Sequence, residues 1–535
     1  MAPFTRLYVI RYQHIPWIYA FRFLRVSLSL QLADSHHELL TALHHLRAVS
    51  NLAESQGDSA VYVTCTTLEA MVHMRTASAD SIEQVQRAIA SARSLQLQDS
   101  VKDLVQVWTL LDFIDLSCSL MQCNPEQVAI KNQAMQELMD NLQDSSAWSD
   151  DGTIAVPLSR PGGHLTDSTN GIFQRSEDGK HDCILFSWLT KRDLYTLGIL
   201  LSGIAIQLKS TTDRRAENVL NEGVKLITGE QCSTLSLLFQ LTHITENFSQ
   251  AGLKELSITP QSSSLSTAAL RLQWWTYTQW YLHLHLAFVQ CNRSDWSAAR
   301  IHLKALLEVS EDPSTDTSYR RRRWTTYLTG IIEQGSGNTA IALSAFQDPL
   351  LAITSTTPNS VSDSQGDLRL LAALNTLLII RSPAHPQHYL AEPLMTTLAP
   401  LTLQHTHKSI VSATYLLKSI LNPADPITEK KQSLQSALNN ARAINNSQLL
   451  AVSMNVMTSM FFKDIVSEQA QKSTKASQVL AKRAETPLWG AVASGMMVDC
   501  LEKQGHGQAA DRVRVEADRY VDTLPECVKK SLLQE

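Results

Sequence analysis

Amphipathic helical segments separated by short polar breaks dominate the chain from Asp34 onward. The stretch DSHHELLTALHHLRAVSNLAE begins with Ser35 and Glu38 at the spacing of a helix-capping box and then repeats leucine every three or four residues. Similar segments occupy roughly 58–76, 80–95, 99–122 and 125–143. Because each segment is short and apolar on one face, the pattern predicts successive antiparallel helices that bury these faces against one another.

The spacing of small residues indicates a tetratricopeptide-like repeat. Such a repeat has a small residue in its first helix, an alanine twelve positions later and a bulky apolar residue four beyond. Gly330, Ala342 and Phe346 satisfy both spacings. The other positions that the pattern assigns to packing between helices are Gly198, Gly203, Ala216, Ala287, Ala299, Leu303, Trp489, Ala509 and Val513. We therefore expect an all-α fold, a superhelical array of antiparallel helix pairs with a curved groove.

Two of these sets fit the repeat less closely. Gly203 and Ala216 are thirteen residues apart, which is one too many. Met497, Ala509 and Val513 keep the spacing but begin with a large residue. The prediction of a repeat therefore rests on the succession of matches along the chain.

An apolar stretch at 186–208, FSWLTKRDLYTLGILLSGIAIQL, could be taken for a membrane segment. Its apolar part is too short to cross a bilayer, and charged residues bound both ends. A second amphipathic segment follows, with Asp213 as its expected N-cap and Ala216 where the two helices would cross. The stretch therefore predicts a helical hairpin and no membrane anchor.

The polar stretch 144–182 interrupts the helical pattern. It contains Pro-Gly-Gly and two strand-like pieces, TIAVPL and GIFQRS, so we expect an exposed insertion that can hold a short β-hairpin. The N-terminal residues carry four arginines and no acid, a composition that a mitochondrial presequence also has. We favour a truncated first helix that follows irregular or misassigned sequence. The expected organisation is an irregular segment at 1–33, helical repeats at 34–143, the insertion at 144–185, a repeat array at 186–525 and a tail at 526–535.

Motifs for catalysis, cofactor binding and metal binding are missing from the sequence. It has no phosphate-binding loop, no dinucleotide-binding glycine motif and no nucleophile elbow. HELLT has Thr41 where a zinc protease needs its second histidine, and HLH at 283–285 and HTH at 405–407 lack carboxylates at ligand spacing. The eight cysteines are scattered, as is typical of buried reduced thiols. We therefore expect no enzymatic activity, no cofactor and no metal.

Clusters of basic residues are the most specific polar feature. The whole chain has 46 Lys and Arg against 51 Asp and Glu, a net charge of −5, so it has no global attraction for nucleic acid. YRRRRW contains Arg320, Arg321, Arg322 and Arg323, which form either a solvated helix face or a patch for an acidic or phosphorylated partner; nuclear import and DNA contact are further alternatives. The candidate companions of this recruitment patch are Lys472, Lys475, Lys482 and Arg483.

Three stretches resemble the fungal cohesin-loading factor family: FSWLTKRDLYTLGILLSG at 186–203, DRRAENVLNEGVKL at 213–226 and the segment 461–520, which begins FFKDIVSEQAQKSTKASQVL. The resemblance implies a non-enzymatic, tetratricopeptide-type subunit of the cohesin loader in the nucleus, on chromatin. It further implies that the array binds the N-terminal segment of a large HEAT-repeat subunit. The two would load the cohesin complex for sister-chromatid cohesion and chromosome segregation, and a surface patch would recruit them to chromatin receptors.

Two other interpretations stay open. A tetratricopeptide adaptor of a chaperone or cell-cycle complex would bind a peptide in its groove and would hold the C-terminal carboxylate with basic residues. An enzyme would need a site around the 144–182 insertion, whose sequence offers no suitable set of ionisable residues. We expect neither direct sequence-specific binding of nucleic acid nor a membrane contact.

Overall fold

The computed structural model contains twenty α-helices, three β-strands and two short 3-10 helices in the residues that it describes. The described residues are 14–31, 36–76, 80–143, 152–159, 171–176, 181–210, 213–228, 265–309, 316–353, 364–422, 424–462, 468–526 and 528–529. Neighbouring helices pack as pairs, and the strands form one small sheet, so the predicted all-α array is confirmed. The fold divides into two compact units.

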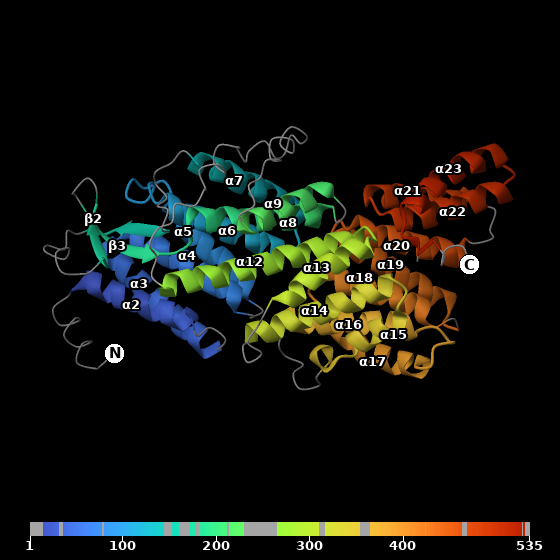
Figure 1. Cartoon of the computed structure of the whole chain (residues 1–535), viewed down its shortest axis with the longest axis horizontal. Coiled ribbons are helices and arrows are strands. Elements are labelled where there is room, and N and C mark those ends of the chain that lie inside the picture. Colours follow the sequence, from blue (N-terminus) through green and yellow to red (C-terminus); the bar gives the residue numbers. More distant parts are fainter. Residues whose placement is uncertain are drawn as a thin grey trace. The chain divides into compact units, whose positions relative to one another are not determined.

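The first unit comprises residues 1–122, 126–201 and 229–275. Its helices are α2 (Ile15–Gln31), α3 (His36–Gln56), α4 (Ser59–Arg75), α5 (Ser81–Arg93), α6 (Val105–Met121), α7 (Pro125–Gln143), the first part of α8 (Lys191–Lys209) and the part of α12 (Leu265–Asn292) up to residue 275. Consecutive helices from α2 to α6 pack against one another, and α4 also contacts α6 (Figure 1). Tyr19, Phe23 and Val26 of α2 are buried in this core, so a packed helix lies inside residues 1–33, the segment for which the sequence favours a truncated first helix after irregular residues.

A three-stranded antiparallel sheet belongs to the first unit. Strands β1 (Thr153–Pro157), β2 (Phe173–Arg175) and β3 (Asp182–Ser187) are ordered β1-β3-β2. The two strand-like pieces of the sequence form β1 and β2, whereas β3 was not expected. Ile154 and Val156 of β1 are buried, because β1 packs on α4. The described strands of the insertion are therefore part of the core and are not an exposed hairpin.

One buried carboxylate fixes the end of β1 to the helices. Asp58, at the start of α4, accepts hydrogen bonds from the Tyr19 hydroxyl at 2.8 Å and from the Ser159 backbone N–H at 2.9 Å. Its side chain is buried, and a buried carboxylate is tolerated only when it is hydrogen-bonded. Asp58 thereby connects α2, α4 and the segment after β1.

The second unit comprises residues 123–125, 202–228 and 276–535. Its helices are the end of α8, α9 (Arg214–Thr228), the part of α12 (Leu265–Asn292) from residue 276, α13 (Trp296–Glu308), α14 (Asp316–Gly335), α15 (Thr339–Phe346), α16 (Ser364–Ile380), α17 (Ala391–Thr402), α18 (Lys408–Leu421), α19 (Ile427–Ala443), α20 (Ser447–Phe461), α21 (Glu468–Arg483), α22 (Pro487–Lys503) and α23 (Gly507–Thr523). The 3-10 helices are η2 (Pro349–Leu351) and η3 (His388–Leu390). From α13 to α23 every helix packs on the next one in sequence (Figure 1).

The residues at the repeat positions lie between paired helices. Gly330 of α14 lies against the ring of Phe346 of α15, and a Cβ atom at this glycine would overlap that ring. Ala342 of α15 is fully buried, as are Ala287 of α12 and Ala299 of α13. Leu303 is also buried. The small residues thus stand where helix backbones approach most closely.

Two sets show how the repeat spacing varies. Gly203 of α8 lies against Leu220 of α9, one helical turn after the buried Ala216. The two helices therefore pack closely at Gly203, although Gly203 and Ala216 are one residue further apart than the repeat spacing. In the last pair Ala509 is exposed; the buried alanine is Ala510, one residue later, and it packs with Met497. The predicted packing position of Ala509 is therefore shifted by one residue.

The remaining repeat positions lie in different surroundings. Val513 is partly buried against the cluster around Ala510. Gly198 lies against the side chains of Met139 and Phe113 in the first unit. Trp489 is partly exposed, and its backbone carbonyl accepts a hydrogen bond from the Asn455 side chain at 3.4 Å.

The apolar stretch around α8 is a packing helix. Its start is capped reciprocally, because the Thr190 hydroxyl donates to Asp193 Oδ2 at 2.7 Å and the Asp193 backbone N–H donates to Thr190 Oγ1 at 3.2 Å. The Trp275 indole N–H also donates to Asp193 Oδ1 at 2.7 Å. Among the described helices none has the length and apolar character needed to cross a membrane.

Candidate partner-binding site

The arginine run on α14 is divided between the surface and the interior. Arg320 and Arg322 are exposed, whereas Arg321 and Arg323 are buried, Arg323 to 1% exposure. The Arg321 guanidinium lies 4.4 Å from the centre of the Tyr277 ring, a cation–π contact. Residues two apart on a helix are about 200° apart around its axis, so Arg320 and Arg322 leave α14 in nearly opposite directions. The four arginines therefore do not form one continuous basic surface.

The cations of α21 lie together. Lys472, Lys475, Val479 and Lys482 follow one another at spacings of three, four and three residues, which places them on one face of the helix. All four are exposed. Lys472 makes an ion pair with Glu468 at 2.6 Å, but both side chains are largely in water, where such a pair contributes little.

Arg483 follows at the end of α21 and donates a hydrogen bond to Asn445 Oδ1 at 3.3 Å. Helix α14 packs on α13, α15 and α16, whereas α21 packs on α20 and α22. The arginine run and the lysines of α21 thus belong to different helix pairs.

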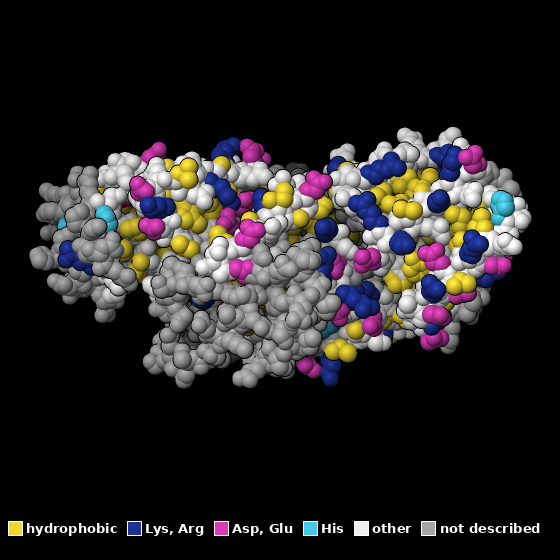
Figure 2. All heavy atoms as spheres, turned by 90° about the horizontal axis from the view of Figure 1, so that it is seen from above, with side chains coloured by type: hydrophobic (Ala, Val, Ile, Leu, Met, Phe, Trp, Pro, Cys, Tyr) yellow, Lys and Arg dark blue, Asp and Glu magenta, His cyan; other side chains and the backbone are white. Residues whose placement is uncertain are grey.

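A groove of about 360 Å³ adjoins the exposed face of α21. We call it the α21 groove, and its lining residues are Leu438 and Arg442 of α19, Leu450 and Met454 of α20, and Lys475, Ala476, Val479 and Leu480 of α21. Figure 2 shows Lys and Arg side chains around hydrophobic ones on the face over the C-terminal helices. The groove combines an apolar floor with two cations at its edge, Arg442 and Lys475.

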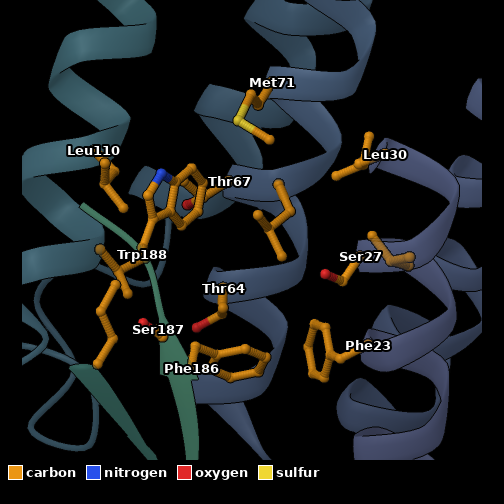
Figure 3. A pocket seen from close by; sticks show the side chains of 14 residues that line it. Phe23, Ser27, Leu30, Thr64, Thr67, Met71, Leu110, Phe186, Ser187 and Trp188 are labelled. Atoms are coloured by element: carbon orange, nitrogen blue, oxygen red, sulfur yellow. The ribbon is translucent and has the colours of Figure 1, made fainter. Parts of the chain in front are cut away.

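An apolar pocket of about 300 Å³ lies within the first unit (Figure 3). We call it the α2–α6 pocket; it is lined by Phe23, Val26, Ser27, Leu30, Thr64, Thr67, Leu68, Met71, Val107, Leu110, Ile154, Phe186, Ser187 and Trp188. The rings of Phe23 and Phe186 meet edge to face, with centres 4.7 Å apart. None of the lining side chains is ionisable, so a charged ligand group would lose its hydration here without gaining a partner.

Hydroxyl groups in the α2–α6 pocket are mostly engaged inside the helix. Thr64 donates to the Ala60 carbonyl at 2.8 Å and Thr67 to the Val63 carbonyl at 2.9 Å. The pocket therefore suits a large uncharged side chain or a similar apolar group. Sequence reasoning missed it, because its lining comes from α2, α4, α6, β1 and the end of β3, and each segment resembles an ordinary core segment.

The histidine motif at 405–407 has a carboxylate partner that lies far from it in the sequence. Asp367 Oδ1 lies 2.9 Å from His405 Nε2, and Asp367 Oδ2 lies 3.3 Å from His407 Nε2. The partner was not recognised because it comes from a separate helix, α16. Even so, no set of three or more His, Cys, Asp or Glu side chains in the described part of the chain could hold a metal ion.

Burial shifts the pKa values of two half-buried histidines and one buried cysteine toward their neutral forms. His283 Nδ1 and His302 Nδ1 are 3.1 Å apart. Burial, followed by the neighbouring His283, lowers the pKa of His302 to about 4. Burial raises the pKa of the free thiol of Cys291 to about 12, so it is not a nucleophile at neutral pH.

The described residues thus provide two apolar hollows, the α2–α6 pocket and the α21 groove, and the second has cations at its edge. A comparison with curated protein sequences gives no match. A family model described as "Cohesin loading factor" matches residues 8–508, from α2 to α22. That family serves in cohesin loading and is of a non-catalytic, scaffold type. Because the match spans nearly the whole chain, this protein belongs to the cohesin loading factor family.

Proposed function

We propose that the chain is the scaffold subunit of the cohesin loader and holds the N-terminal segment of the large HEAT-repeat subunit against its helix pairs. Together the two proteins would load cohesin onto chromatin in the nucleus, for sister-chromatid cohesion and chromosome segregation. Family membership supports the role in cohesin loading. The identity of the partner rests on the resemblance of the sequence to fungal members.

The observation that carries the scaffold role is the uncharged α2–α6 pocket, which lies open in a helix array. A cavity of about 300 Å³ is large enough for one bulky side chain. Leu24 and Leu28, one turn apart on α2, are exposed beside the lining residue Ser27 and extend the apolar surface beyond the pocket. An extended polypeptide can use such a run of sites, because each buried side chain offsets part of the cost of ordering the segment.

Recruitment to chromatin receptors is the second part of the proposal. Of the basic residues predicted for this role, solvent reaches Arg320, Arg322, Lys472, Lys475, Lys482 and Arg483. Guanidinium and ammonium groups on the surface would attract an acidic or phosphorylated receptor. Charge reversal of Arg320 and Arg322 is expected to weaken recruitment while the large subunit stays bound.

Co-purification from nuclear extract tests the scaffold role. The full chain should recover the large HEAT-repeat subunit and cohesin. Ser27→Trp places an indole in the mouth of the α2–α6 pocket and should reduce recovery of the large subunit. Ser55→Trp, the same change at an exposed site of α3 outside the pocket, is the matched control. Recovery of a chaperone or cell-cycle complex in place of cohesin would contradict the proposal.

A further inference from the structure

We propose that the α21 groove binds an acidic polypeptide segment that carries one large apolar side chain. The apolar side chain would enter the groove, and carboxylates on either side of it would pair with Arg442, Lys475 and Lys482. For its biological role the inference rests on the proposed function, since the segment would belong to a receptor for the loader. Its binding chemistry is independent of that role.

The floor of the groove explains the need for an apolar side chain. Leu438, Leu450, Met454 and Leu480 turn toward a hollow of about 360 Å³, which is large enough for one bulky residue. Val479 at its edge is 60% exposed, although Ser477 and Ala481, two residues before and after it, are buried. An exposed β-branched residue beside an apolar hollow forms a surface that loses unfavourable contact with water when a partner covers it.

The cations at the edge select an acidic partner. Arg442, Lys475 and Lys482 are exposed, and none of them has an ion pair or hydrogen-bonded acid among the described residues. Lys475 and Lys482 are seven residues apart, which is about 10 Å along the helix axis. Three residue steps of an extended chain, at about 3.3 Å each, cover a similar distance. Two acids separated by two residues, one of them the apolar residue, therefore match the spacing of the two lysines.

The same geometry does not suit nucleic acid. Single strands bind where bases stack on aromatic side chains, and none of the lining residues of the α21 groove is aromatic. Tight binding to a phosphate backbone also needs many cations along a track. The arginine run of α14 cannot supply them, because it lies on a helix that does not pack on α21.

Fluorescence anisotropy with the full chain tests the inference. The probe is a dye-labelled twelve-residue peptide with glutamates on both sides of a central phenylalanine. Matched peptides replace the phenylalanine by serine or the glutamates by glutamine. We expect Lys475→Glu to weaken binding of the first peptide by about tenfold or more and Val479→Asp by about fivefold, since each adds repulsion or a charge in the site. Lys408→Glu, an equal charge change at an exposed position on α18, should leave binding within about twofold.

Several results would overturn the inference: equal binding of the three peptides, equal weakening by Lys408→Glu, tighter binding of a single-stranded oligonucleotide, or no binding of the first peptide by the wild-type chain. Thermal unfolding of each variant checks that the fold persists. Co-purification with the large subunit is measured separately. If the wild-type chain binds the peptide but recovers no large subunit, the proposed function fails and the groove assignment stands; the reverse outcome rejects the groove alone.

Discussion

Substitution of Gly330 by alanine should destabilise the pair formed by α14 and α15. Alanine normally stabilises a helix interior relative to glycine, by about 1 kcal/mol. At Gly330, however, the added Cβ would lie 2.7 Å from Cδ1 and 2.8 Å from Cζ of Phe346, well inside van der Waals contact. Phe346 is itself buried with Tyr327, Leu351 and Leu368, so its ring has no free space to enter.

The net magnitude follows from these two opposing effects. Overpacking of a well-filled core costs about 1–3 kcal/mol, and the upper end applies because the overlap involves several ring atoms. After the gain in helix preference is subtracted, we expect a loss of about 2 kcal/mol. That change raises the population of the locally open state about 30-fold.

Amide hydrogen exchange resolved by peptide is the suitable assay, because repeat arrays open in parts. Exchange should accelerate in α14 and α15 of the Gly330→Ala protein. Gly495→Ala is the matched control: this glycine also lies inside a helix, α22, but apart from its two chain neighbours and the backbone of its own helix no atom lies within 4 Å of the position of its added Cβ. That variant should exchange more slowly in α22.

Phe346→Leu separates a local clash from a general effect. In its background the ring is gone, so Gly330→Ala should stabilise the helix by about 1 kcal/mol, and the coupling between the two sites should be about 3 kcal/mol. Slower exchange in α14 of the single Gly330→Ala protein would refute the reasoning, because it would mean that the Phe346 ring does not limit the approach of the two helices.

Three further predictions concern two buried charged side chains and one histidine that desolvation keeps neutral. Asp58→Asn should free the segment after β1 and cost about 1–3 kcal/mol, seen as faster proteolysis within 144–182, while the exposed Asp99→Asn should have no such effect. Arg323→Glu should unfold α14, at about 3–5 kcal/mol, whereas Arg322→Glu should leave the thermal midpoint unchanged. Burial lowers the pKa of His285 from 6.5 to about 4, so unfolded chains take up a proton that folded chains do not. The contribution of His285 to stability should therefore be full above pH 6.5 and fall as the pH decreases toward 4. Thermal midpoints measured across this range should fall less steeply for His285→Asn.

The helix pairs could be predicted from sequence because their signals are local. Capping residues and the spacing of Gly330, Ala342 and Phe346 depend only on the geometry of one helical hairpin. The pairing of Asp367 with His405 and the recruitment of β3 into the sheet depend on segments far apart in the chain. No periodicity marks such contacts, and the same limit explains why the α2–α6 pocket was missed.

The number of sides on which neighbours cover a helix determines how clearly its sequence shows an apolar face and a polar face. Helix α4 buries residues on all sides, from Val61 and Val63 to Cys65, so its sequence lacks a polar face and resembles that of α8, which could be taken for a membrane segment. Helix α14 packs on α13, α15 and α16, and the alternate arginines Arg321 and Arg323 of its run are buried. Helix α21 is covered on one side and keeps a single polar face with a three- and four-residue rhythm. Basic residues three or four positions apart on a helix that is covered on one side all point in one direction, whereas consecutive basic residues do not. The first pattern therefore indicates a binding surface better than an uninterrupted run does.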